Sequence, residues 1–124
     1  MSIPNYKYDE ISDTLTITFV PGALATGIEL NDHILLRVDK VAQRAVGMSI
    51  FDYSVLAQPT EFGLRSLPLS GLDELSESTR DLVLAILQSE PVHSVLALSA
   101  YAPTATETIA IAALQLPNPL LQAA

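Results

Sequence analysis

The chain has 124 residues, of which 49% are hydrophobic and 16% charged, and it contains no cysteine. This composition excludes disulfides and thiolate metal sites, and predicts a single globular domain over residues 1–124, because disordered chains are more polar. A formal net charge of −8 argues against nucleic-acid binding, which requires cations that displace counterions from the phosphates.

The N-terminal residues, MSIPNYKYDE, lack the cationic and apolar regions of a signal peptide, so we expect a cytoplasmic protein. The apolar C-terminal stretch is interrupted by polar residues and Pro103 before it reaches the roughly 18–20 residues of a membrane span. We therefore expect it to form core and to have no membrane role.

Residues 6–54 are predicted to form an antiparallel β-meander of four to five strands. The clearest strand is TLTITF, residues 14–19, in which threonines alternate with apolar residues. Further strands are expected at 6–9, 24–30, 33–39 and 45–52, with 24–30 returning antiparallel to 14–19. Asn31-Asp32 is expected to form a two-residue hairpin turn, since both residues tolerate positive φ.

Gly47 lies inside the last of these strands, in AVGMSIFD, where Val46, Met48 and Ile50 are expected to face inward. A glycine weakens a strand and commonly marks a bulge or a close backbone approach. We therefore expect a structural role, a strong twist or a tight crossing, at Gly47.

The segments YKYDEISDTLTITF, IELNDHILLRVD and AVGMSIFDYS follow one another in an order that resembles the small bacterial family catalogued as domain of unknown function 2283. The resemblance covers roughly residues 6–54, and the matching positions are Tyr8, Asp9, Asp13, Leu15, Ile17, Asp32, Val46, Gly47, Ile50, Asp52 and Ser54. It implies no activity, but some members are encoded beside small toxin-like proteins, which implies a partner role. His33 and DKVAQRAVG depart from the family pattern, so the turn after residue 39 is expected to differ in geometry.

Residues 55–77 contain prolines, glycines and scattered polar groups, and are predicted to be a connecting loop that includes one helical turn. The next segment predicts a helix at about 78–89, with Ser78 as its cap, Asp81 three residues later and Pro91 as a stop. Apolar residues cover most of its circumference, so it must pack against the strands, another chain or both.

The helix is expected to be followed by a β-hairpin that turns at Pro103-Thr104, completing a unit over residues 78–116 before a tail at 117–124. Thr104 and Glu107 also match a capping box, which leaves a helix over 104–116 as the alternative. Because no Lys or Arg follows Arg80, an exposed apolar edge here would pair with another copy. We expect a homodimer through this region.

Five aspartates are expected near strand ends, where they could bind a divalent cation or act as an acid–base pair, although turn formation is the favoured role: Asp9, Asp13, Asp32, Asp39 and Asp52. His33 could form a proton-transfer pair with Asp32, and His93 is expected in the core or an interface. A Ser49, His33 and Asp52 set can be assembled, but no glycine-flanked serine of the nucleophile-elbow type accompanies it.

The sequence therefore predicts an α+β protein and assigns no catalytic, cofactor-binding or metal-binding residues. The favoured function is a non-enzymatic protein–protein interaction module that self-associates, and the resemblance adds an antitoxin-like role toward a basic protein, whose opposite charge would speed encounter. The alternative is an enzyme or binding protein that holds a small ligand or divalent metal with strand-end carboxylates.

Overall fold

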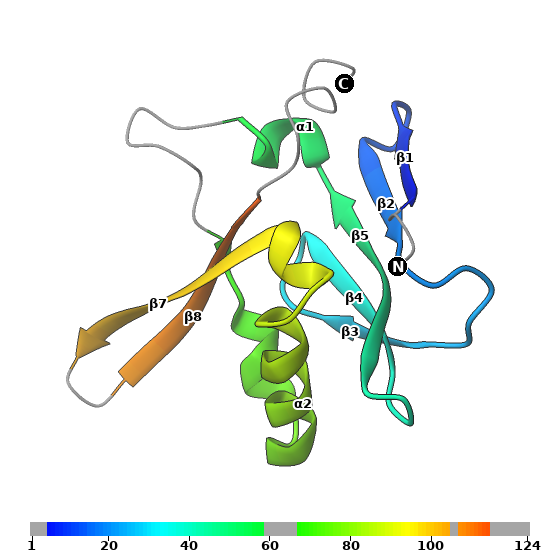
Figure 1. The fold of residues 1–124 in the computed structure, drawn as a ribbon. Helices are drawn as coiled ribbons and strands as arrows, with labels where there is room; N and C mark the ends of the chain where they lie inside the picture. Colours follow the sequence, from blue (N-terminus) through cyan, green and yellow to red (C-terminus); the bar gives the residue numbers. More distant parts are fainter. Residues whose placement is uncertain (1–4, 59–66, 105–106, 115–124) are drawn as a thin grey trace.

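The structure is a computed structural model that describes residues 5–58, 67–104 and 107–114 (Figure 1). The first five strands are β1 (Asn5–Asp9), β2 (Thr14–Thr18), β3 (Thr26–Glu29), β4 (Ile34–Asp39) and β5 (Arg44–Phe51). There follow α1 (Tyr53–Leu56), β6 (Leu67–Pro68), the 3₁₀ turn η1 (Ser70–Glu74), α2 (Glu77–Leu87), the 3₁₀ turn η2 (Val92–Ser94), β7 (Leu96–Thr104) and β8 (Glu107–Leu114). The predicted α+β class, with an antiparallel sheet first, is confirmed.

The first sheet has the strand order β1-β2-β5-β4-β3, so its neighbours do not simply follow the chain. The expectation that residues 24–30 pair with residues 14–19 is wrong: β2 pairs with β5, and β3 pairs with β4 at the sheet edge. β5 is the longest strand of this sheet and is buried over six consecutive residues. A strand in the centre of a sheet is covered by neighbours on both sides, which suits the long buried stretch of β5. The less buried β3 lies at the edge.

Gly47 has the structural role expected of it. A Cβ at this position would lie 2.8 Å from the carbonyl oxygen of Ile17 and 2.8 Å from Nη2 of Arg37. The pairing of β4 with β5 also shifts next to Gly47, where Arg37 lies opposite Gly47 but Val38 lies opposite Ala45. Only glycine lets the Arg37 side chain and the neighbouring strand approach this closely.

Two hairpin turns at opposite ends of the sheet have the same design. Each has four residues, 10–13 and 40–43, and each follows an aspartate whose Oδ1 accepts the amide hydrogen two residues later: Asp9 from Ile11 and Asp39 from Val41, both at 3.0 Å. The last residue of each turn has positive φ, 52° at Asp13 and 56° at Gln43. The turn after residue 39 therefore has the same geometry as the turn after residue 9.

The turn between β3 and β4 is not the predicted two-residue hairpin. Neither Asn31 nor Asp32 has positive φ, and Leu30 donates its amide hydrogen to the carbonyl of Ile34 across three intervening residues. Oδ1 of Asn31 accepts from the amides of His33 and Ile34 at 2.8 and 2.9 Å. These two bonds to the Asn31 side chain stabilise the turn, which therefore does not need the positive φ angles of a two-residue turn.

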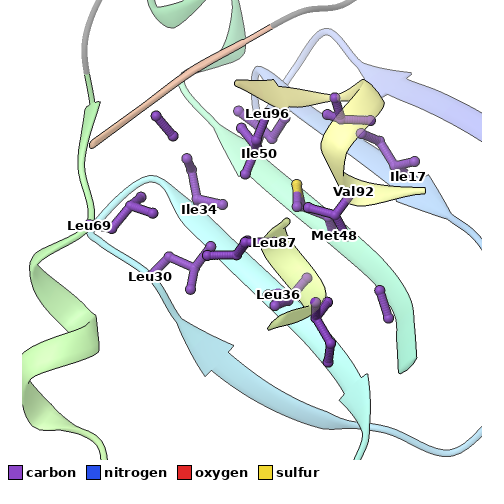
Figure 2. Close-up of a cluster of buried hydrophobic side chains, with 14 of the residues drawn as sticks. Ile17, Leu30, Ile34, Leu36, Met48, Ile50, Leu69, Leu87, Val92 and Leu96 are labelled. Carbon is purple, nitrogen blue, oxygen red and sulfur yellow. The ribbon is translucent and has the colours of Figure 1, made fainter. Parts of the chain in front are cut away.

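The core lies between one face of the five-stranded sheet and the back half of the chain (Figure 2). Alternate residues of β2, β4 and β5 meet Val83, Ile86 and Leu87 of α2, together with Val92 of η2. As expected from its apolar circumference, α2 packs against the strands. Its cap is Ser76, which accepts the amide hydrogen of Thr79, and the prediction of Ser78 as the cap is wrong because the helix begins two residues earlier.

The C-terminal hairpin is present, and the helical alternative over 104–116 is excluded for the described residues because β8 runs from Glu107 to Leu114. The predicted turn at Pro103-Thr104 is too early: β7 continues through Thr104, which pairs with Glu107. β6 pairs with the C-terminal half of β8 and completes a three-stranded sheet in the order β6-β8-β7. The predicted loop 55–77 thus contains β6 and η1, whereas residues 59–66 and the tail 117–124 lie outside the described residues.

Candidate functional site

The turn between β1 and β2 is joined to the end of β5 by a hydrogen-bond network centred on Asp13. Oδ1 of Asp13 accepts from the Tyr8 hydroxyl at 2.7 Å and from the Ser54 amide at 3.0 Å. Oδ2 accepts from the Ser54 hydroxyl at 2.7 Å, and the Asp13 carbonyl accepts from the Tyr53 amide. The network therefore ties the first hairpin to α1, forty residues later in the chain.

The same bonds shift the acidities of their partners. Hydrogen bonds from Tyr8 and from Ser54 lower the pKa of Asp13 below its ordinary 3.8, because they stabilise the carboxylate. The bond to Asp13 is the main cause that raises the pKa of Tyr8 from 10.0 to about 12, since the phenol must stay protonated to donate it. The network is a structural clamp, in which the carboxylate of Asp13 joins Tyr8 of β1 to Ser54 of α1.

We expect the clamp to weaken at both ends of the pH range. The folded pKa of Asp13 is lowered, so Asp13 stabilises the fold above its unfolded pKa and loses this effect as the pH falls through the folded pKa. The folded pKa of Tyr8 is raised, so Tyr8 stabilises the fold below pH 10 and loses this effect as the pH rises toward about 12. Urea midpoints between pH 9 and 12 should therefore fall more steeply for the wild type than for Tyr8→Phe.

Two further variants control this experiment. Asp13→Asn removes the carboxylate that accepts from both Tyr8 and Ser54, so it should flatten the acid limb as well. The double variant should add little to Asp13→Asn alone, because the bond that Tyr8→Phe removes has already lost its charged acceptor. Parallel alkaline losses in the wild type and Tyr8→Phe would show that the bond does not form in solution.

His33 and Asp52 form a second contact at this end of the sheet. Nδ1 of His33 lies 3.1 Å from Oδ2 of Asp52, an ion pair whenever the imidazole is protonated, but it makes no aligned hydrogen bond within the described residues. The two side chains are 41% and 61% exposed, so water screens the pair and its energy is small. Of the hypothetical catalytic set, His33 and Asp52 are in contact, whereas the Ser49 hydroxyl accepts from Nη1 of Arg37 and makes no hydrogen bond with His33 within the described residues.

The remaining predicted residues have separate places. Asp9 and Asp39 order the two similar turns at opposite ends of the sheet, as the turn interpretation predicts, and Asp32 lies exposed in the β3–β4 turn. His93 is exposed in η2, so the expectation of a core position is wrong, and a position in an interface stays a prediction. The described residues contain no group of three or more His, Asp or Glu side chains placed to hold a metal ion.

A groove that the sequence did not indicate runs along the free edge of β3. Its cavity volume is about 560 Å³, within the range of ligand sites, and its two walls are β3 and the segment from η1 to the start of α2. Thr26, Gly27 and Glu29 line the first wall, and Ser70, Glu74 and Thr79 line the second. The two walls of the groove are more than forty residues apart in the chain, so no local sequence pattern predicts it.

Comparisons with protein-family models, curated proteins and solved structures found no match to this chain. Among the helices of the described residues, none is long and apolar enough to cross a membrane.

Proposed function

We propose that the chain is a non-enzymatic protein–protein interaction module that self-associates, as a homodimer, through the outer edge of β7. The observation that carries this proposal is the β7–β8 hairpin, whose far end points away from the five-stranded sheet and α2 (Figure 1). β7 is nine residues long, contains no charged residue and is the outer strand of the order β6-β8-β7.

An edge strand of this kind favours pairing with another chain. The outer edge of β7 carries no strand within the described residues, so its backbone amides and carbonyls there lack ladder partners. Proteins that remain monomeric commonly protect such edges with lysine, proline, bulges or short strands. In β7 the proline, Pro103, and a register shift after Tyr101 stand near the far end, so the edge proposed for pairing is the part from Leu96 to Tyr101. Pairing of β7 with β7 of a second copy would extend the sheet symmetrically.

The resemblance to domain of unknown function 2283 supports a further part of this proposal, a basic protein partner in the manner of an antitoxin. A net charge of −8 would attract such a partner and raise its association rate. The Asp13 clamp serves this function indirectly, because it holds the first hairpin and α1 in a fixed arrangement.

Self-association is tested by sedimentation velocity of the full chain over a range of concentrations. Ala97→Lys places a charge on β7 at a half-buried position that pairs with Ala113, and should weaken dimerisation about tenfold or more by opposing edge pairing. Gln88→Lys adds the same charge at an exposed position after α2 and should leave dimerisation unchanged. A wild type that stays monomeric at high concentration would overturn the proposal.

A further inference from the structure

The β3 edge groove has the backbone geometry of a strand-acceptor site. Leu30 bonds to Ile34 of the neighbouring strand, and alternation along an antiparallel pair then turns the backbone groups of Gly27 and Glu29 away from β4. The groove lies on that outward side. At its far end, the amide of Gly71 donates to the carbonyl of Leu30, and a Cβ on Gly71 would lie 1.9 Å from the carbonyl oxygen of Glu29. The turn η1 therefore covers both of these carbonyls and leaves the edge open at Gly27.

Gly27 is the most accessible point of this edge. It is exposed, and it has no side chain to cover its amide and carbonyl. Ile28 is buried and fixes the strand to the core, so the edge that Gly27 presents is held in an extended conformation. An incoming extended segment would therefore meet a preformed strand, which lowers the conformational entropy lost on binding.

The charges around the groove select the partner. Three exposed carboxylates line it, those of Glu29, Asp32 and Glu74, against one cation, Lys40. None of the three carboxylates makes an ion pair or a side-chain hydrogen bond within the described residues. They are therefore available to a cationic ligand, and a lysine or arginine side chain on a bound strand could reach them.

We propose that the edge of β3 binds an extended peptide segment rich in lysine or arginine, supplied by a partner protein, as an added strand of the five-stranded sheet. This inference deepens the proposed function, because it assigns the basic partner to one surface. It is separate from self-association, which uses β7 in the other sheet. The two surfaces would allow a dimer to hold two copies of the partner.

The test uses a fluorescein-labelled peptide of alternating lysine and valine, titrated with the full chain and followed by fluorescence anisotropy at low salt. We expect saturable binding, and we expect none to the matching peptide of alternating glutamate and valine. N-methylation of alternate residues of the lysine peptide keeps its charge but removes the amides that pair with Gly27, and should weaken binding about tenfold.

Two double variants separate the groove from the general acidity of the chain. Glu29→Gln with Glu74→Gln should weaken binding of the lysine peptide about tenfold, because two contacts to lysine are lost. Glu77→Gln with Asp81→Asn removes the same charge from exposed positions of α2 that do not line the groove, and should have little effect.

Equal affinity for the methylated and unmethylated peptides, or equal losses of affinity in the two double variants, would overturn the inference. Either result would show that the peptide binds through unspecific charge attraction alone. Sedimentation velocity of the same samples reports the oligomeric state independently. A dimer that does not bind the peptide would overturn this inference alone, and a monomer that binds it would overturn only the self-association proposal.

Discussion

Replacing Leu87 with alanine is expected to lower the free energy of unfolding by about 2–5 kcal/mol, the range for a large buried aliphatic side chain. Leu87 is 1% exposed and belongs to the cluster that α2 forms with the sheet, where Figure 2 draws it with Leu30 and Leu36. Its loss leaves a cavity at the contact between the two halves of the chain. Urea unfolding followed by circular dichroism measures the effect.

The matched control is Leu84→Ala, which truncates the same side chain on the same helix at a half-buried position. We expect it to cost clearly less than Leu87→Ala, because less apolar surface returns to water on unfolding. Equal costs, or a Leu87→Ala loss below about 1 kcal/mol, would mean that α2 does not seal the sheet as the structure shows.

Gly71→Ala is expected to destabilise the fold by about 2–4 kcal/mol, through a collision with the backbone and a strained hydrogen bond. A Cβ at Gly71 would lie 1.9 Å from the carbonyl oxygen of Glu29, and backbone cannot rotate away as a side chain can. To relieve the overlap, η1 must move from β3, and the bond from the Gly71 amide to Leu30 weakens. Chemical denaturation of the purified variant gives the size of the loss.

Gly22→Ala distinguishes this collision from the ordinary cost of replacing a glycine. Gly22 has a φ of 74° but nothing within 4 Å of its missing Cβ, so alanine there meets conformational strain alone, about 1 kcal/mol. We expect Gly71→Ala to be the more damaging change. A Gly71 variant as stable as the Gly22 variant would show that η1 does not rest on the β3 edge.

Local patterns were sufficient to locate the five strands of the first sheet and the turns at Asp9 and Asp39. The alternation in TLTITF places Leu15 and Ile17 in the core, and the same rule identifies the buried positions of β4. Asp9 and Asp39 are turn residues, as the chemistry of aspartate predicts, because their side-chain bonds reach only two or three residues along the chain. The weakness of Gly47 as a strand residue also indicated a close approach.

The candidate sites depend on contacts that no local pattern contains. The chemistry of aspartate predicts a turn at Asp13 but indicates nothing about its partners, and the structure brings Tyr8, Asp13 and Ser54 together across forty residues as a clamp. β4 pairs with one edge of β3, and η1 packs against the opposite edge, which forms the groove. Asn31 was correctly assigned to a turn, but its side chain, and not its backbone angle, shapes that turn.

The amino-acid order alone established which residues of β2 and β4 face inward, since side-chain direction alternates along a regular strand whatever the strand pairs with. In β5 the register shift breaks this alternation, and Ala45 joins the core cluster where Val46 was expected. The amino-acid order did not establish the partners of the strands. That choice followed from burial of the whole sheet: β5, covered along most of its length, occupies the centre, and this leaves β3 at an edge, where η1 packs against it. Strand pairing is set by the total burial of distant segments, which becomes defined only when the chain is folded.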